Sequence, residues 1–161
     1  MRNFEKKRQL FKQLLSENLQ RLNTALDTLN YSLDKCEKID LESTIEPESM
    51  ESLEALTARF ARVSDILTQK VLKTIFLLLQ EQPGSFIDQT NRAEKLQIIP
   101  DATQLQTIRE LRNEIAHEYR VQSMEELYSD VLENSRILIA TIEAVEQYSH
   151  QHNLLPDDAG L

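Results

Sequence analysis

The sequence of 161 residues predicts an all-α protein, built as an antiparallel bundle of four to five helices. It holds only 2 glycines and 4 prolines, and no stretch shows the sustained β-branched and aromatic alternation that strands require. Leucines and other apolar residues instead recur at steps of three and four, which places them on one face of a helix. We expect a single helical domain over residues 1–153 and a flexible C-terminal tail over residues 154–161.

Two long helices are predicted in the first half of the chain. The first covers about residues 4–38, and its apolar stripe consists of Phe11, Leu15, Leu19, Leu22, Leu26, Leu29 and Leu33. After an acidic loop, Pro47 suits the first turn of a second helix over about residues 49–80. The end of that helix is apolar on more than one side, from Val71 to Leu79. A surface that wide predicts either a deep core or a subunit interface.

Three further helices are predicted in the second half. Pro83 and Gly84 stop the second helix, and a short helix is expected over residues 91–98, before Pro100. Asp101 and Ser123 stand where a helix N-cap would stand, each followed three residues later by Gln or Glu. They predict helices over residues 102–117 and 123–150.

Composition narrows the classes of function. One cysteine, Cys36, excludes an intrachain disulfide framework and a cysteine-based zinc cluster. No apolar run reaches the ~18 residues of a membrane span, and the charged N-terminal stretch is unlike a signal peptide. We therefore expect a cytoplasmic protein with no membrane contact. The net charge of −9 counts against nucleic-acid binding, although residues 2–12 carry a net positive charge and residues 34–54 a strongly negative one.

Residues 109–119 combine three side chains with chemistry in common. Arg112 carries a permanent positive charge on a planar fork that suits a phosphate. His117 can take or give a proton near neutral pH, and the phenol of Tyr119 lies close by in sequence. Together they form a minimal set of groups for cutting a phosphodiester without a metal ion.

Helix geometry constrains how these groups could meet. Arg112 and Tyr119 are seven residues apart and share one face, whereas His117 lies roughly 140° around the axis from Arg112. Either the helix unwinds near His117, or a symmetric dimer brings two copies of the helix together. We favour the dimer, because the wide apolar end of the second helix also requires a partner.

The segment Arg112-Asn113-Glu114-Ile115-Ala116-His117-Glu118-Tyr119 resembles the Arg-x4-6-His signature of the HEPN family, a group of small all-α RNA-cutting domains. It also fits the narrower Arg-x4-His-x-Tyr form of the HepT-type toxins, which are encoded beside a minimal nucleotidyltransferase (MNT) antitoxin. The helix order is similar over residues 4–150, while the sequence-specific likeness is confined to the motif.

The resemblance implies a HEPN/MNT toxin: a metal-independent ribonuclease that acts on RNA as a homodimer and needs no cofactor. His117 would be the general acid/base that helps the ribose 2′-OH attack the neighbouring phosphate. Arg112 would stabilise charge on the phosphate oxygens, and Asn113 would orient His117 or the phosphate. Tyr119 would be modified by AMPylation, in which the nucleotidyltransferase antitoxin transfers AMP to it, and the added anion would repel an RNA backbone.

Three other interpretations stay open. Arg112 could be a surface cation, His117 a residue favoured by the helix dipole, and Tyr119 a core residue with its hydroxyl at the surface. The chain could be a non-catalytic HEPN-like module that binds nucleotide or docks a nucleotidyltransferase, which would suit its acidic charge. It could also be a helical adaptor in which Arg112 and His117 are replaceable; a neighbouring nucleotidyltransferase gene would disfavour that hypothesis.

Overall fold

The computed structural model of the chain describes residues 1–117 and 123–157. Its helices in chain order are α1 (Arg2–Cys36), α2 (Pro47–Ile66), a π-helical turn (Leu67–Val71, the π-turn), α3 (Leu72–Leu79), α4 (Phe86–Lys95), α5 (Ala102–Ala116) and α6 (Met124–Gln151). No β-strand occurs in these described residues. The prediction of an all-α bundle is confirmed.

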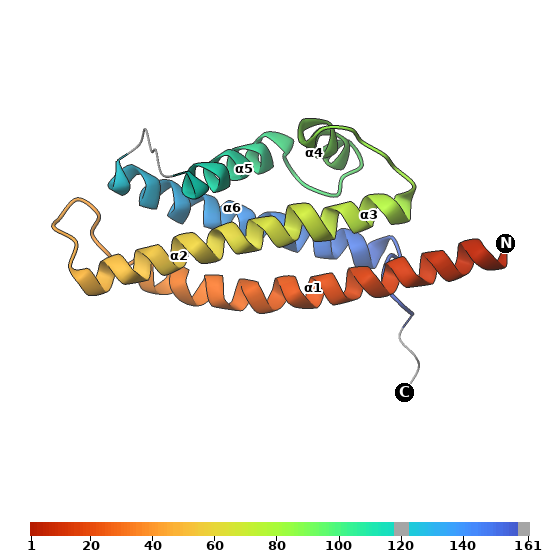
Figure 1. Cartoon of the computed structure of the whole chain (residues 1–161), viewed down its shortest axis with the longest axis horizontal. Helices are drawn as coiled ribbons and strands as arrows, with labels where there is room; N and C mark the ends of the chain where they lie inside the picture. Colours follow the sequence, from red (N-terminus) through yellow and green to blue (C-terminus); the bar gives the residue numbers. More distant parts are fainter. Residues whose placement is uncertain (118–122, 158–161) are drawn as a thin grey trace.

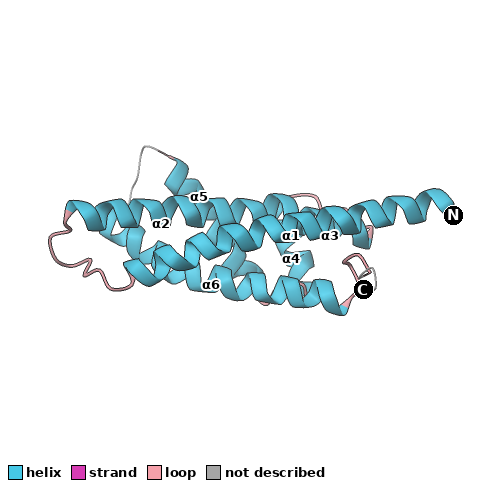
Figure 2. Ribbon diagram, turned by 90° about the horizontal axis from the view of Figure 1, so that it is seen from below, coloured by secondary structure: helices cyan, strands magenta, loops and turns pink. Residues whose placement is uncertain are grey.

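The long helices run alternately in opposite directions. Helix α1 lies beside the continuous rod formed by α2, the π-turn and α3, which runs back along it (Figure 1). Helix α5 reverses the direction again and packs on α2 and α6, and α6 returns along the bundle. The short helix α4 packs on α5. Seen from below, the first turns of α1 extend beyond the other helices (Figure 2).

Side-chain caps explain where α5 and α6 begin. The Asp101 carboxylate accepts the N–H of Gln104 at 3.0 Å, and the Ser123 hydroxyl accepts the N–H of Glu126 at 3.2 Å. Each cap satisfies a backbone donor that has no partner within the helix. Pro47 occupies the first turn of α2. The predicted starts of these three helices agree with the structure to within about two residues, the usual scatter of helix ends.

The prediction for α4 was wrong in its boundaries, because the helix begins at Phe86 and not at residue 91. Its start is a complete capping box, in which the Ser85 hydroxyl accepts the N–H of Asp88 and the Asp88 carboxylate accepts the N–H of Ser85. The helix ends before Gln97, which adopts the left-handed conformation with φ 63°. Gln97 takes the place that glycine usually fills after a helix.

The apolar stripe of α1 faces the core as predicted, with Leu15, Leu22 and Leu29 fully buried. The wide apolar end of the second helix is also covered within the single chain. Val71, Leu72, Ile75, Phe76 and Leu78 are all at most 4% exposed, while Leu77 is 49% exposed. The surface therefore belongs to a deep core, which was one of the two predicted explanations. It no longer serves as an argument for a dimer.

The π-turn explains the breadth of that apolar surface. A π-turn holds one residue more than an α-helical turn, so it rotates every later side chain around the helix axis. The ladder that ends at Leu67 is followed by the adjacent pair Val71 and Leu72, and both are buried. The extra residue thus turns α3 so that residues on several of its sides are buried.

Two further findings concern the surface and the C-terminal end. Within the described residues, no helix combines the length and the apolar character needed to cross a membrane. Leu154 is 1% exposed, and its N–H bonds the carbonyl of Ser149 at 3.0 Å. The first residue of the predicted tail therefore packs against the core.

Candidate functional site

Helix α5 carries the motif and holds it against the bundle through one apolar face. Leu105, Ile108 and Leu111 are at most 5% exposed. The polar motif residues lie around this buried line: the side chain of Arg112 is 28% exposed, and Asn113 and His117 lie at the surface. Tyr119, the predicted modification site, lies outside the described residues. Only the Arg112-to-His117 part of the motif can therefore be placed.

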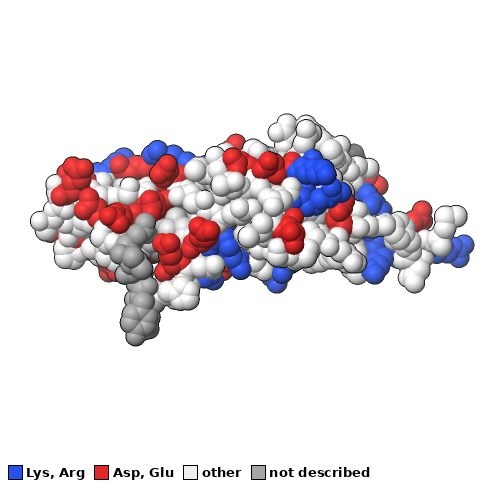
Figure 3. Space-filling model, turned by 90° about the horizontal axis from the view of Figure 1, so that it is seen from above, with Lys and Arg blue, Asp and Glu red and all other residues white. Residues whose placement is uncertain are grey.

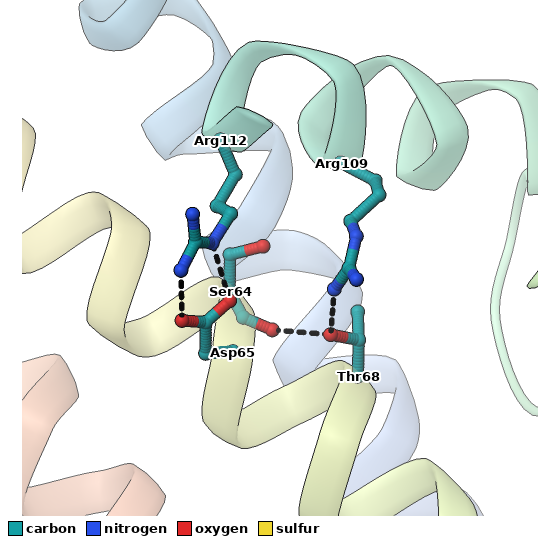
Figure 4. A network of polar contacts seen from close by, with 5 residues as sticks. All are labelled: Ser64, Asp65, Thr68, Arg109 and Arg112. Carbon is teal, nitrogen blue, oxygen red and sulfur yellow. Dashed lines mark hydrogen bonds and ion pairs between the residues drawn. The ribbon is translucent and has the colours of Figure 1, made fainter. Parts of the chain in front are cut away.

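Arg112 forms a two-pronged ion pair with Asp65 of α2. Its Nε donates to Asp65 Oδ1 at 2.7 Å, and its Nη2 donates to Oδ2 at 2.8 Å (Figure 4). This fork-to-fork geometry fixes the guanidinium plane as well as its position. The hydrogen bonds that Arg112 donates to Asp65 raise the pKa of Arg112 above its ordinary value, so the group stays charged. Three of the five N–H donors of the guanidinium remain outside this pair.

A second arginine of α5 contacts the π-turn. Arg109 Nη1 donates to Thr68 Oγ1 at 3.4 Å, and the Thr68 hydroxyl donates to the carbonyl of Ser64 at 2.9 Å (Figure 4). The Arg109 guanidinium also lies 5.3 Å from the ring centre of Phe86 in α4. The hydroxyl of Ser64, a residue with no exposed surface, has no hydrogen-bond partner in the described part of the chain. Two arginines of α5 thus meet polar groups on consecutive turns around the π-turn.

His117 stands immediately after the last residue of α5. Its backbone is extended, with φ −90° and ψ 135°, and its N–H bonds the carbonyl of Glu114 at 3.2 Å. The predicted helix over residues 102–117 therefore ends one residue early, so the helical angle between Arg112 and His117 does not apply to the histidine. Among the described residues no hydrogen bond joins these two side chains. The chain places Arg112 against Asp65 and leaves His117 exposed at the helix end.

The surface on the other side of α5 is acidic. A groove of about 400 Å³ runs between α5 and α6, and we call it the α5–α6 groove; its acidic lining residues are Asp101, Glu110, Glu114, Asp130 and Glu133. Figure 3 shows acidic side chains gathered over the left half of this face of the molecule. An RNA backbone would be repelled by such a surface. The expectation that the net charge of −9 counts against nucleic-acid binding agrees with this side of the structure.

Sequence reasoning missed the residues that hold the motif in place. Asp65 is 47 residues from Arg112 in sequence, and nothing in the local pattern of α2 singles it out. Thr68 and Ser64 were missed for the same reason. The adjacent apolar pair Val71 and Leu72 was the one available signal of the π-turn, since a regular helical ladder does not place neighbours on one face.

In residues 1–117 and 123–157, no three His, Cys, Asp or Glu side chains are grouped so that they could hold a metal ion. Comparison with protein-family models finds no matching family, and comparisons with curated proteins and with solved structures find no significant match.

Proposed function

We propose that this chain is a metal-independent ribonuclease of the HEPN/MNT type, with Arg112 and His117 as its reacting pair. The observation that supports it best is the state of the two side chains. Arg112 is held in a fixed plane by Asp65 and still keeps three N–H donors, and His117 is exposed beyond the helix end. The spacing Arg-x4-His that links them is the one that resembles the family.

The proposed reaction is an internal transfer at phosphorus. His117 removes the proton of the ribose 2′-OH, whose oxygen forms a new bond to the adjacent phosphorus. The bond from phosphorus to the 5′ oxygen of the next nucleotide breaks, and that oxygen takes up a proton. The products are a 2′,3′-cyclic phosphate and a free 5′-hydroxyl. Arg112 stabilises the negative charge that builds up on the phosphate oxygens, and Asn113, exposed on α5, orients the histidine or the phosphate.

The remaining parts of the proposal rest on the family resemblance. A homodimer would bring the motifs of two chains to one cleft, so that Arg112 of one protomer could act with His117 of its partner. A cognate nucleotidyltransferase antitoxin would neutralise the enzyme by AMPylation of Tyr119. An AMP group there would add negative charge beside a site that must admit RNA.

The test compares purified wild-type protein with a His117→Ala variant on total RNA in the presence of EDTA. Wild-type protein should yield fragments that end in a cyclic phosphate, and His117→Ala should lose this cleavage by at least about a hundredfold. His150→Ala is the matched control, because His150 is an exposed histidine in the last turn of α6. Intact mass is measured first to exclude AMP carried from expression. Unmodified protein that cuts no RNA contradicts the proposal.

A second candidate function draws on the charges of the site. Asp65 already neutralises Arg112, and the α5–α6 groove beside it is lined by acids. Both features suit a non-catalytic module that docks a nucleotidyltransferase through a basic surface of that partner. This function predicts a stable complex in size-exclusion chromatography, loss of the complex when Glu110 and Glu114 become Gln, and no nuclease activity in the purified chain.

A further inference from the structure

The opposite side of α2 carries a groove with the reverse charge. It measures about 700 Å³, runs between α1 and the rod formed by α2 and the π-turn, and we call it the α1–α2 groove. Its lining includes the cations Arg21, Arg62 and Lys70 and one acid, Glu17. The remaining side chains that line it are polar amides and hydroxyls, apart from Ala25 and Ile66. In a chain with a net charge of −9, this surface is a local exception.

The three cations are free to bind an external anion. Arg21, Arg62 and Lys70 are all exposed, and none of them forms an ion pair in the described ranges 1–117 and 123–157. Arg62 and Lys70 are eight residues apart, which separates them by about 12 Å along the helix. Their spacing along the helix allows the two cations to contact different phosphates. At ~3.4 Å per stacked nucleotide, this distance matches about three nucleotides of one strand.

An exposed aromatic ring lies on the same line of α1. Tyr31, Thr24 and Glu17 follow each other at intervals of seven residues, so they share one face of the helix. Thr28 lines the groove, and Tyr31 lies about one helical turn further along α1 with 66% of its surface exposed. Arg59 Nη1 donates to the Thr28 carbonyl and to Ser32 Oγ, and its guanidinium lies 6.0 Å from the centre of the Tyr31 ring. The groove thus leads to a ring that is available for stacking.

We infer that the α1–α2 groove binds single-stranded RNA, with Arg21, Arg62 and Lys70 along the phosphates and Tyr31 stacked on a base. A basic groove that leads to an exposed aromatic ring is the combination that binds single strands without sequence preference. An acidic protein segment could also use the cations, and the exposed ring on the same face of α1 favours the strand, because successive bases stack on such rings. The groove and the candidate site share α2, where Asp65, the partner of Arg112, directly precedes the lining residue Ile66.

This inference rests on the proposed function, because that function identifies the bound strand as RNA. The test measures RNA binding and not cleavage, so that the groove and the proposed function can fail separately. The background is His117→Ala, with a fluorescent 20-nucleotide RNA and anisotropy measured at several salt concentrations. Changing Arg21, Arg62 and Lys70 together to Gln should weaken binding about 10- to 100-fold. It should also reduce the slope of log K against log salt by about 2, at roughly 0.7 for each lost phosphate contact.

Two matched variants separate this effect from general charge and from folding. Lys95→Gln removes one exposed cation of α4 outside the groove and should leave RNA binding within twofold of the background. Tyr31→Ala should weaken binding about tenfold, whereas Tyr31→Phe should keep it, since stacking needs only the ring. All the altered side chains are exposed, so circular dichroism and melting temperature should match the parent.

Three results would overturn the inference. The first is no RNA binding by the His117→Ala background, and the second is equal binding by the triple variant. The third is a change in oligomeric state as the main effect of the triple variant, measured by light scattering. That result would mean that the groove binds an acidic protein surface. Cleavage by the wild type is scored independently. A wild type that cuts RNA and a triple variant that cuts with the same KM would retain the proposed function and reject the groove.

Discussion

The α5–α6 groove and the α1–α2 groove differ in charge although they lie in one small helical bundle. The α5–α6 groove has a volume of about 400 Å³, and its lining includes five acids. The α1–α2 groove has a volume of about 700 Å³, and its lining includes three cations and one acid. Between them, Arg112 and Asp65 cancel each other. Although the net charge of the chain is −9, its surface has one groove that should repel polyanions and another that should attract them.

This difference in charge indicates from which side of the molecule an RNA strand could approach the motif. A strand that came over the α5–α6 groove would meet acids before it met Arg112. A strand lying in the α1–α2 groove meets cations first and reaches the Arg112–Asp65 pair across α2. The balance of three arginines and three glutamates over residues 109–120 is then no obstacle, because in this proposal another part of the surface supplies the attraction.

The largest expected effect separates chemistry from binding. His117→Ala should lower kcat by about 10²- to 10⁴-fold with little change in RNA affinity, since it removes the proton-transfer group. The triple change of Arg21, Arg62 and Lys70 should raise KM and leave kcat within a few-fold. Steady-state kinetics on a short fluorogenic RNA measures both. If the groove variant lost kcat as His117→Ala does, the two regions would not be separate.

The next effect concerns the boundary between the grooves. Asp65→Asn and Arg112→Gln should each lower the free energy of unfolding, and a double-mutant cycle should give a coupling of up to about 1 kcal/mol, because water screens a pair this exposed. Their effects on RNA should have opposite signs. Asp65→Asn removes a competing acid and strengthens binding, whereas Arg112→Gln weakens it. Urea unfolding and anisotropy test both; equal signs in RNA binding would contradict the proposed role of Arg112.

A stability effect of similar size is expected at Ser64, which precedes Asp65 in α2. The buried hydroxyl of Ser64 has no partner in the described residues, and an unsatisfied buried donor costs about 1–3 kcal/mol. Ser64→Ala should therefore raise the free energy of unfolding by about 1 kcal/mol. Thr57→Ala is the comparison, since the buried Thr57 hydroxyl donates to the Leu53 carbonyl at 2.8 Å and its loss should not stabilise the chain. Thermal melts rank the two, and a less stable Ser64→Ala protein would count against this account.

The smallest effect comes from the acidic side. Glu110→Gln combined with Glu114→Gln removes two acids from the α5–α6 groove and should strengthen RNA binding about twofold at low salt, since unit charges ~10 Å apart in water interact by roughly 0.4 kcal/mol. The gain should vanish at high salt, where the Debye length is short. Weaker binding would mean that RNA contacts this side, and would remove the contrast between the grooves.

The sequence predicted those parts of the fold that depend on neighbours along the chain. The stripe of α1 and the N-caps of α5 and α6 are local signals, and the helices follow them closely. Helix α4 was misplaced because its box uses Asp88, a shorter acid than the Glu or Gln that usually completes the motif. The deep core at the end of the second helix could not be told from an interface, because a pattern of apolar residues does not say what covers it.

The candidate site likewise combines features that the local sequence predicts with features that it does not. The spacing of Arg112, Asn113 and His117 was evident in the sequence, and the cap at Asp101 predicted the start of α5, whereas the end of the helix before His117 was missed by one residue. The pairing of Arg112 with Asp65 depends on how two helices pack, at a distance of 47 residues in the chain. The α1–α2 groove likewise combines one cation of α1 with two from the next helical rod. Such groupings arise only when the bundle has formed.

The π-turn has a consequence for how the molecule moves. Regular α-helical hydrogen bonds give way there to wider ones, so amide hydrogens around Leu67–Val71 should exchange with deuterium sooner than those of the equally buried centre of α1. Helices α2 and α3 then behave as two rigid rods joined by a soft segment, and the bond from Arg109 to Thr68 fastens that segment to α5. Opening of the π-turn would also break the bond from Arg109 to Thr68, while the buried face of Leu105, Ile108 and Leu111 keeps α5 on the bundle.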